Sequence, residues 1–382
     1  MSRRRLRVIA GMAAIMAAIG CALSTPAQAP VQYQYKILHS FAAHGDGSEP
    51  QGRVVFDQKG NLYGTTDAGG AYNGGTAFEL TPNANGQWTE TILHSFADGA
   101  TDGAFPTGVV IDGAGDLYGT TTFGGTGSQC TSNEGCGTVF ELSPGANGQW
   151  TESILYDFCS LPNCADGSEP KGSPSFDAKG NWYGQTASGG IDGLDCDSGC
   201  GTVFGLHPQS DGQWKEVELY DFQSANSVDG SGPGEGMTVH GQGIYGATGG
   251  GGTAHCSCGT VFEVMRGSGN TFDEQVLHSL ANAGQGITPS GPVEFDSHGD
   301  LFGVTLFGGS PSCECGVVYG MRQGSGGNWG YAVLHAFAGT DGSTPNSGLT
   351  VDSKGNLYGV AAAGGPNGYG VVFELSPMKS SR

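Results

Sequence analysis

The chain is poor in basic residues and in charge of any kind. It carries 15 lysines and arginines against 36 aspartates and glutamates, which gives a formal net charge of −21, and only 13% of its residues are charged. Four of the arginines lie within the first seven residues, so the remainder is more acidic still. Because nucleic acids and anionic membrane surfaces are bound through basic patches, neither is expected as a partner.

Long apolar runs are confined to the N-terminus. Residues 1–29 combine the basic start with an apolar stretch from Val8 to Leu23 and the sequence Ala27-Gln28-Ala29, the three parts of a secretory signal peptide. We therefore expect a secreted or periplasmic mature protein, with lipid attachment at Cys21 as the alternative. No later run reaches the roughly 20 apolar residues that cross a bilayer, so we expect no membrane span.

Familiar catalytic motifs and helical periodicity are also missing. The sequence contains no Gly-x-Ser-x-Gly elbow, no His-Glu-x-x-His and no phosphate-binding loop. What it has in abundance is glycine, with 72 residues. That composition alone could indicate disorder, but aromatic and branched residues recur at fixed places along the chain. Disordered segments show no such period.

A Tyr-Gly or Phe-Gly step recurs six times at intervals of 55 to 65 residues. Its glycines are Gly64, Gly119, Gly184, Gly246, Gly303 and Gly359. Each unit holds four short apolar runs bounded by turn residues, which is typical of strands; in the second unit we expect them at 107–111, 116–121, 137–142 and 150–158. The period and the strand count predict an all-β fold, a six-bladed β-propeller with four-stranded antiparallel blades, over residues 30–377, followed by a short tail at 378–382.

Alignment of the six units on the Tyr-Gly step also predicts the hairpins and the closure of the ring. Five units carry an Asp-x-x-Gly-Asn/Asp step, as at 57–61, which favours a tight hairpin, and the fourth unit is one residue shorter at 240–243. By analogy with other six-bladed propellers, the innermost strands should begin after Pro50 and its five equivalents. The chain then starts with an outermost strand at 35–41 and ends on a third strand at 371–375. We expect these two to pair and to close the ring.

Ten cysteines follow the signal peptide, an even number that favours disulfides in an exported protein. Their positions in the repeats predict five local bridges. The pairs are Cys130–Cys136, Cys159–Cys164, Cys196–Cys200, Cys256–Cys258 and Cys313–Cys315. The Cys-x-Cys pairs need a tight bend to bring their Cα atoms close enough. The alternative is a zinc site made by the four cysteines of those two pairs.

Two sets of polar residues are candidate ligand-binding positions. Five units place an Asp-Gly step before the inner strand, and these aspartates could form an acidic ring that binds Ca²⁺ or sugar hydroxyls, although Asp-Gly also simply makes a turn. They are Asp46, Asp102, Asp166, Asp229 and Asp341, with Gln285 in the fifth unit. The second set follows the prolines at the expected channel mouth, where unlike polar groups would suit an asymmetric ligand. It comprises Gln51, Thr107, Lys171, Glu235, Ser290 and Asn346.

The histidines of the Leu-His-Ser-Phe motif are expected to pack between blades. Strand alternation places His39, His94, His278 and His335 on a regular face of an outer strand. Tyrosine replaces them in two units. The tryptophans that open the same strands should cover the core. We therefore expect no catalytic residue and no metal ligand among these histidines and tryptophans.

The repeated motifs Leu-Tyr-Gly-Thr-Thr, Gly-Thr-Val-Phe-Glu-Leu and Leu-His-Ser-Phe, from about Tyr35 to Pro377, resemble the tandem repeats of the choice-of-anchor GloVer family. The resemblance implies an exported bacterial repeat protein, often tethered by a C-terminal sorting segment. This chain lacks an apolar tail after Pro377, which favours release to the periplasm or medium.

These observations predict a monomeric, exported binding module without a cofactor, whose partner is a carbohydrate or a cell-surface protein. The alternative is a metal-dependent hydrolase, lactonase or lyase of the propeller kind, with Ca²⁺ as its metal. A structural protein of the cell envelope is the third possibility.

Overall fold

Short antiparallel strands make up almost all of the regular structure in the computed structural model. It describes residues 32–378 except 43, 98, 100–101, 127–134, 162–163, 165, 167, 178–179, 189–201, 210–213, 222–229, 235, 254–255 and 267–271. The chain divides into a unit of residues 1–30 and a unit of residues 31–382, and the fold below is that of the second. The expected signal peptide with Cys21, and all but the first residue of the tail, lie outside the described residues.

The strands form six sheets, numbered here as blades in chain order. Blade 1 holds β2 (Ser48–Phe56), β3 (Leu62–Ala68), β4 (Thr76–Pro82) and β5 (Trp88–Ser95), preceded by the 3₁₀ turn η1 (His44–Asp46). Blade 2 holds β6 (Gly103–Ile111), β7 (Leu117–Gly124), β8 (Thr138–Pro144) and β9 (Trp150–Asp157). Blade 3 holds β10 (Ser168–Phe176), β11 (Trp182–Ser188), β12 (Thr202–Pro208) and β13 (Trp214–Asp221).

The remaining blades follow the same order from the centre outward. Blade 4 holds β14 (Ser231–Pro233), β15 (Thr238–His240), β16 (Gly243–Gly250), β17 (Thr260–Arg266) and β18 (Phe272–Ser279), its innermost strand being split in two. Blade 5 holds β19 (Ile287–Phe295), β20 (Leu301–Phe307), β21 (Val317–Gln323) and β22 (Trp329–Ala336). Blade 6 holds β23 (Thr350–Val351), β24 (Leu357–Ala361), β25 (Val371–Pro377) and β1 (Tyr33–Ser40).

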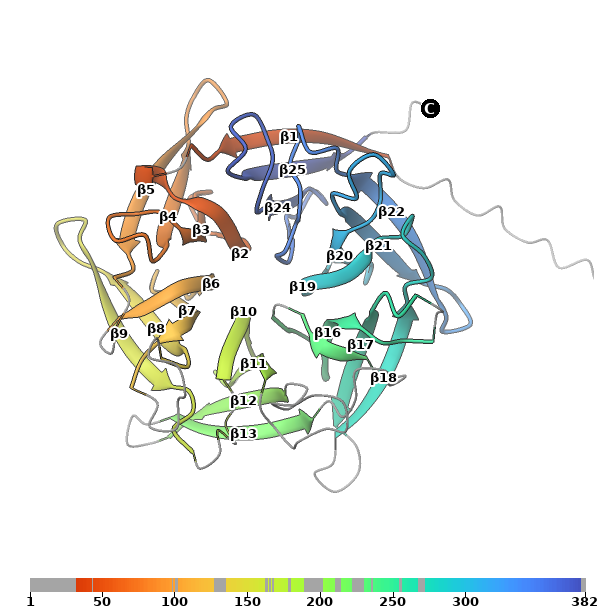
Figure 1. Ribbon diagram of the computed structural model, residues 1–382, viewed down its shortest axis with the longest axis horizontal. Helices are drawn as coiled ribbons and strands as arrows, with labels where there is room; N and C mark the ends of the chain where they lie inside the picture. Colours follow the sequence, from red (N-terminus) through yellow and green to blue (C-terminus); the bar gives the residue numbers. More distant parts are fainter. Residues whose placement is uncertain are drawn as a thin grey trace, which may run out of the picture. The chain divides into compact units, whose positions relative to one another are not determined.

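The N-terminal strand closes the ring, as the sequence predicts. β1 runs antiparallel to β25, with Tyr33 opposite Pro377 and Ser40 opposite Val371. In Figure 1 the red β1 lies outside the blue β25, and the six innermost strands converge on the centre. The first and last parts of the propeller therefore share one sheet, and the predicted six-bladed, four-stranded architecture is confirmed.

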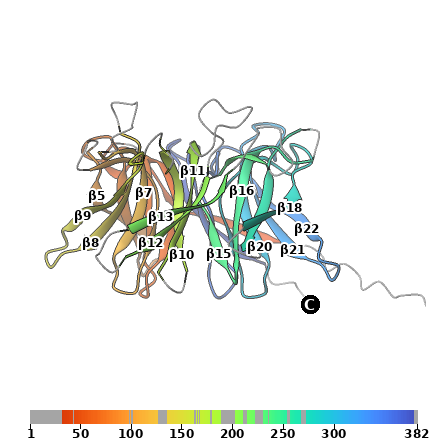
Figure 2. The ribbon, with the colours of Figure 1, turned by 90° about the horizontal axis from the view of Figure 1, so that it is seen from below.

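Strand direction defines two faces of the propeller. Because neighbouring strands are antiparallel, the connections between blades and those between second and third strands emerge on the same side, which we call the loop-rich face. The tight hairpins of the 57–61 type lie on the opposite side, where β25 also ends. Figure 2 shows the blades edge-on.

The hairpins form as predicted. In the first, the Asp57 N–H donates to Asn61 O (3.0 Å), the Gly60 N–H donates to Asp57 O (3.2 Å), and Gly60 has a φ of 88°. The shorter fourth hairpin is tighter, with His240 directly opposite Gly243. Glycine at the left-handed position avoids the steric cost that a side chain would add there.

Five of the six inner strands begin earlier than the sequence suggested, whereas β23 begins at Thr350, after Pro345. β2 starts at Ser48 rather than after Pro50, and Pro50 itself pairs with Thr66. The register then shifts between Gln51 and Val55. An innermost strand has one neighbour only, so a proline that lacks the N–H donor is tolerated within it.

The hydrophobic core lies between blades, as six clusters that each join two neighbouring blades. One cluster, for example, packs Leu38, Phe41 and Val372 of blade 6 against Val54 and Phe78 of blade 1. The tryptophans that open the outer strands are half-buried at the rim of these clusters. Each blade is therefore stabilised mainly by its neighbours, which makes closure of the ring important.

Candidate functional site

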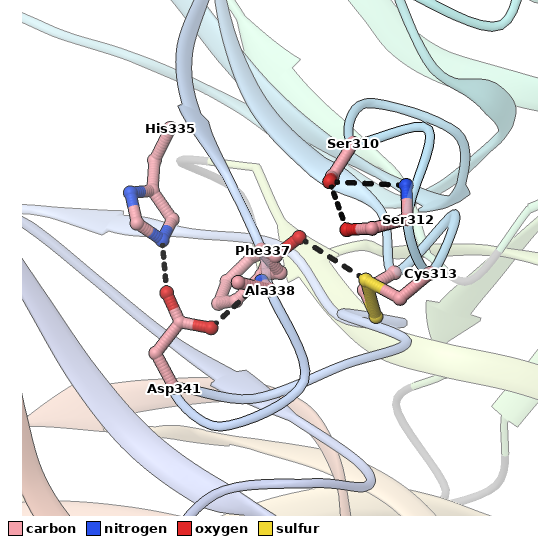
Figure 3. The surroundings of a disulfide bond; sticks show 8 residues. Ser310, Ser312, Cys313, His335, Phe337, Ala338 and Asp341 are labelled. Atoms are coloured by element: carbon pink, nitrogen blue, oxygen red, sulfur yellow. Dashed lines mark hydrogen bonds and ion pairs between the residues drawn. A yellow bond between two sulfur atoms is a disulfide. The ribbon is translucent and has the colours of Figure 1, made fainter.

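The Asp-Gly aspartates lie beside the outermost strands and cap the loops between blades. Asp102 accepts a hydrogen bond from the Ala97 N–H (2.9 Å), and Asp166 accepts one from the Ser160 N–H (2.9 Å). Asp46 and Asp341 accept equivalent bonds from Ala42 and Ala338. Figure 3 shows Asp341 held between the Ala338 N–H and the His335 ring. Asp229 lies outside the described residues.

Glutamine replaces aspartate in the fifth unit without loss of this bond. The Ala281 N–H donates to Gln285 Oε1 at 2.8 Å. The shared property of the described members is therefore an acceptor oxygen for a turn, and these described carboxylates lie beside the outermost strands rather than around the centre of the ring.

At the four junctions whose three members are all described, the capping residue is the centre of a three-residue cluster that spans two blades. The first member is a histidine or tyrosine of one outer strand, and the third is a glutamate or tyrosine of the next outer strand. At the junction of blades 6 and 1, His39 Nε2 lies 4.0 Å from Asp46 Oδ2 and 3.8 Å from Glu90 Oε2. At the next junction, His94 Nε2 lies 3.5 Å from Asp102 and 3.8 Å from Glu152. Neither glutamate is among the site residues that the sequence predicts.

Burial changes the titration of these clusters. It raises the pKa of Glu90 to about 8, and the Asp46 carboxylate adds to this rise. Burial, helped by hydrogen bonding to Asp102, likewise raises the pKa of Glu152 to about 9. Burial also lowers the pKa of His39, against the opposing effect of Asp46. At neutral pH each buried glutamate therefore holds a proton unless a cation replaces it.

Of the second candidate set, Gln51, Thr107 and Ser290 lie on innermost strands and Asn346 lies in the segment before β23. Three of these four residues bond to one another. Ser290 Oγ donates to Asn346 O (3.1 Å), and Asn346 Nδ2 donates to Gln51 Oε1. Thr107 Oγ1 and Thr120 Oγ1 lie 2.7 Å apart. The contacts of Asn346 tie blades 5, 6 and 1 together, whereas the threonine pair lies within blade 2. The Lys171 side chain and Glu235 lie outside the described residues.

Buried polar groups without hydrogen-bond partners among the described residues lie in the same region. Gln185 is 1% exposed, and neither its amide oxygen nor its amide nitrogen has a hydrogen-bond partner among the described residues. Ser173 Oγ, Ser347 Oγ and Asn346 Oδ1 are equally unpaired there. Leaving such groups without partners costs roughly 1–3 kcal/mol each, so they favour a polar occupant. Sequence reasoning missed Gln185, which stands where the other repeats have threonine, alanine or valine.

One ion pair crosses between strands of non-adjacent blades. Arg53 Nη1 on β2 lies 2.9 Å from Glu294 Oε2 on β19, and blade 6 lies between their blades in the ring. Burial raises the pKa of Glu294, whereas the Arg53 guanidinium lowers it. The repeat alignment gave no signal for this pair, because neither residue recurs at its position.

The exposed aromatic side chains of the described residues lie on the loop-rich face. Tyr72 is 67% exposed, Tyr369 46% and Phe307 45%. Tyr72 and Tyr369 belong to connections between second and third strands, and Phe307 ends β20. They come from blades 1, 6 and 5, which are neighbours. Tyr369 O also accepts the N–H of Glu49 at the start of the innermost strand β2 (3.2 Å), which places this loop beside the channel mouth.

The cysteine loops lie on this face as well. The structure joins Cys159 to Cys164, Cys256 to Cys258 and Cys313 to Cys315. Cys136 is also disulfide-bonded, but its expected partner Cys130 and the pair Cys196–Cys200 lie outside the described residues.

The expected tight bend is present in both Cys-x-Cys pairs. Their middle residues, Ser257 and Glu314, have φ values of 46° and 51°, and the paired Cα atoms are 5.1 and 5.2 Å apart. Figure 3 shows Cys313 against the chain at Phe337, whose carbonyl oxygen lies 3.5 Å from its Sγ. The two pairs do not converge into a four-cysteine site, since the groups of possible metal ligands among the described residues lie elsewhere.

The opposite face carries a shallow cleft of about 530 Å³ between the first two blades. It lies between the 57–61 and 112–116 hairpins, with Tyr63 and Trp150 in its wall. The rings of these two residues are 6.4 Å apart.

No helix of the described residues is long and apolar enough to cross a membrane.

Fold and motifs together define a six-bladed β-propeller built from tandem repeats. The chain belongs to the Gloeobacter/Verrucomicrobia repeat family, whose model matches residues 27–204 and 127–373. No curated protein matches the chain in sequence.

Solved structures share the fold at low sequence identity. A gluconolactonase from Xanthomonas campestris is 13% identical with a TM-score of 0.54, and the match covers 91% of this chain and 90% of that one. A glucose dehydrogenase is 10% identical with a TM-score of 0.52, covering 91% of this chain and 100% of that one. These likenesses support the propeller architecture and carry no information on ligands.

Proposed function

We propose that this protein is an exported binding module that holds a neutral polysaccharide on its loop-rich face. The observation that carries the proposal is the set of exposed aromatic rings on blades 5, 6 and 1, namely Phe307, Tyr369 and Tyr72. Exposed aromatic rings are able to stack on the apolar faces of sugar rings.

The charge of the protein narrows the ligand class. A formal net charge of −21 repels acidic polymers, so a neutral or amino-sugar chain is favoured. The Asn346 amide oxygen, which has no hydrogen-bond partner among the described residues, lies next to Gln51 and offers an acceptor suited to hydroxyls.

The test is binding of the mature protein to a panel of neutral and acidic polysaccharides by affinity gel electrophoresis. We expect retardation by a neutral polymer and a loss of at least about tenfold in affinity for the triple variant Tyr72→Ala, Tyr369→Ala and Phe307→Ala. Val333→Ala, an exposed residue on an outer strand, is the matched control and should bind normally. Binding to no polymer, or equal binding by the triple variant, would refute the proposal.

Hydrolysis of a lactone or a glycoside is the second candidate. Glu294 favours it, because burial raises the pKa of this carboxyl near the channel, as a general base requires. The gluconolactonase with the same fold supplies the substrate to try first. Turnover of gluconolactone by the parent protein and its loss in Glu294→Gln would support this function over simple binding.

A further inference from the structure

Two neighbouring blade junctions bring an imidazole and two carboxylates together in a way that suits a metal ion. At the first, one ligand atom each from His39 of β1, Asp46 of η1 and Glu90 of β5 lies within 4.8 Å of the others. The Glu90 side chain is 9% exposed. Among the described residues, neither Glu90 Oε1 nor His39 Nε2 has a hydrogen-bond partner.

The second junction repeats this arrangement one blade further on. His94 of β5, Asp102 and Glu152 of β9 also place their ligand atoms within 4.8 Å of one another. The Glu152 side chain is 8% exposed, and its Oε1 has no hydrogen-bond partner among the described residues. Two buried carboxylates with an unpaired oxygen, each directed at a histidine, are costly unless something binds them.

Other junctions of the same molecule fill this space with a phenol. Tyr156 takes the histidine position at the third junction, and its hydroxyl donates directly to Asp166 Oδ2 (2.9 Å). At the last two junctions, tyrosine replaces the glutamate and stacks on the histidine. The ring centroids of Tyr331 and His278 are 4.7 Å apart, and those of Tyr35 and His335 are 4.5 Å apart.

These tyrosines also hydrogen-bond to the backbone of the loop between the blades. The hydroxyl of Tyr331 donates to Gln285 O, and that of Tyr35 donates to Asp341 O. Among the junctions whose loop residue is described, the first two are thus the ones that bring a histidine together with two carboxylates.

We propose that each of these two clusters, His39–Asp46–Glu90 and His94–Asp102–Glu152, binds one divalent transition-metal ion of the zinc class. Zinc holds nitrogen and carboxylate ligands at about 2.0–2.2 Å, so its ligand atoms sit roughly 3.4 Å apart in a tetrahedron. The observed separations from the histidine nitrogens, 3.5 to 4.0 Å, need only a small contraction.

The ligand set distinguishes zinc from calcium. Calcium takes six to eight oxygen ligands, whereas one imidazole with two carboxylates suits zinc and its neighbours in the transition series. Two carboxylates also balance the charge of the ion. Water can complete the coordination, because Asp46 remains 28% exposed at the surface of the site.

Such ions would reinforce the ring where it closes. The first site joins β1, the strand that completes blade 6, to β5 of blade 1, and the second joins blade 1 to blade 2. Because the folded ring binds the ion and the separated strands do not, metal binding should stabilise the closed propeller.

The experiment titrates the EDTA-treated, dialysed mature protein with Zn²⁺ by calorimetry and with Co²⁺ by visible absorption. We expect two ions per chain, a Co²⁺ spectrum typical of tetrahedral nitrogen and oxygen ligands, and a melting temperature about 5 °C higher at zinc a hundred times above Kd.

Substitution of the histidines shows which cluster binds each ion. His39→Tyr and His94→Tyr each copy the residue that this chain has at position 156, so the fold should tolerate them. Each should remove one ion, and the double variant should remove both. His298→Ala is the matched control, since His298 is an exposed histidine that contacts Asp296 without a nearby glutamate, and it should keep both ions.

Two outcomes would overturn the proposal. Failure to bind either metal, with a melting temperature unchanged by zinc or chelator, would mean that protons alone occupy the clusters. Full binding by the double variant would place the ions elsewhere, on the cysteines or at the surface.

Discussion

The glycine of the recurring Tyr-Gly step is required because an aromatic ring lies against it. A Cβ atom on Gly119 would come within 2.4 Å of the Phe140 ring and 2.5 Å of the Gly108 carbonyl oxygen. Phe140 in turn packs edge-on against Phe96 of the preceding blade, with ring centroids 5.1 Å apart. The Tyr-Gly, Val-Phe and Leu-His-Ser-Phe motifs are thus three parts of one contact between blades.

We expect Gly119→Ala to lower the free energy of unfolding by about 2 kcal/mol, because the methyl group overpacks this contact. Urea unfolding measures the change. Gly113→Ala is the control, since Gly113 has no atom within 4 Å of the added Cβ, and it should leave stability nearly unchanged. Equal effects of the two substitutions would contradict the packing explanation.

Asp57 stabilises its hairpin through an ionised carboxylate. Its Oδ1 accepts the N–H groups of Lys59 (2.8 Å) and Asn61 (2.9 Å). Burial alone would raise the pKa of Asp57, but the hydrogen bonds from Asn61 and Lys59 outweigh it and the pKa falls below the ordinary 3.8. A lowered pKa in the folded state means that the stabilisation is present above this value and is lost as the pH falls through the folded-state pKa.

We expect Asp57→Ala to cost about 1 kcal/mol at pH 7, and the difference from the parent to shrink below pH 3.8. Urea unfolding of both proteins across this pH range is the measurement. Lys59→Ala keeps the backbone donor and should match the parent. A difference that persists undiminished at low pH would exclude the carboxylate as its source.

At the scale of the strand, β1 has a role that its position at the start of the chain does not suggest. It pairs with β25 over seven residue pairs and brings Tyr35, Ile37 and Leu38 to the cores on both sides of blade 6. Without it, β25 would be an unpaired edge strand and two inter-blade cores would be open.

Deleting residues 30–42 should therefore lower the free energy of unfolding by about 5 kcal/mol or more, a large part of the stability of a typical domain. Thermal unfolding followed by circular dichroism would show it as a large fall in melting temperature or as a failure to fold. Deleting residues 379–382 is the control. If the N-terminally truncated protein melts like the parent, closure by β1 contributes little.

At the scale of the whole molecule, the Arg53–Glu294 pair links strands that are separated by 241 positions in sequence and by a complete blade in space. The side chains are 16% and 24% exposed, so water screens the pair only in part. Removing one partner leaves the other charge poorly solvated near the channel.

A double-mutant cycle with Arg53→Met and Glu294→Gln should give a coupling energy of about 1–2 kcal/mol by urea unfolding. Arg53→Met should also raise the pKa of Glu294 further, because Arg53 lowers it. A raised carboxyl pKa in the folded state means that stability declines as the pH rises above 4.5, and this decline should be steeper in Arg53→Met. Additive effects within about 0.5 kcal/mol would show that the two charges act independently.

The sequence by itself determined the six blades, the closing strand and the hairpins of the 57–61 type. These features depend on local patterns, namely alternation within strands, glycine at left-handed positions such as Gly60, and a period that repeats along the chain. It also placed the motif histidines on a regular face of the outer strands, where the structure finds them.

Only the tertiary structure decided how those elements combine into sites. Asp46 meets Glu90, and Arg53 meets Glu294, because the ring brings together segments from different blades. Gln185 has no hydrogen-bond partner among the described residues, and the packed blades shield it from water. Such relations depend on distances across the closed ring, and a repeat read along the chain does not contain them.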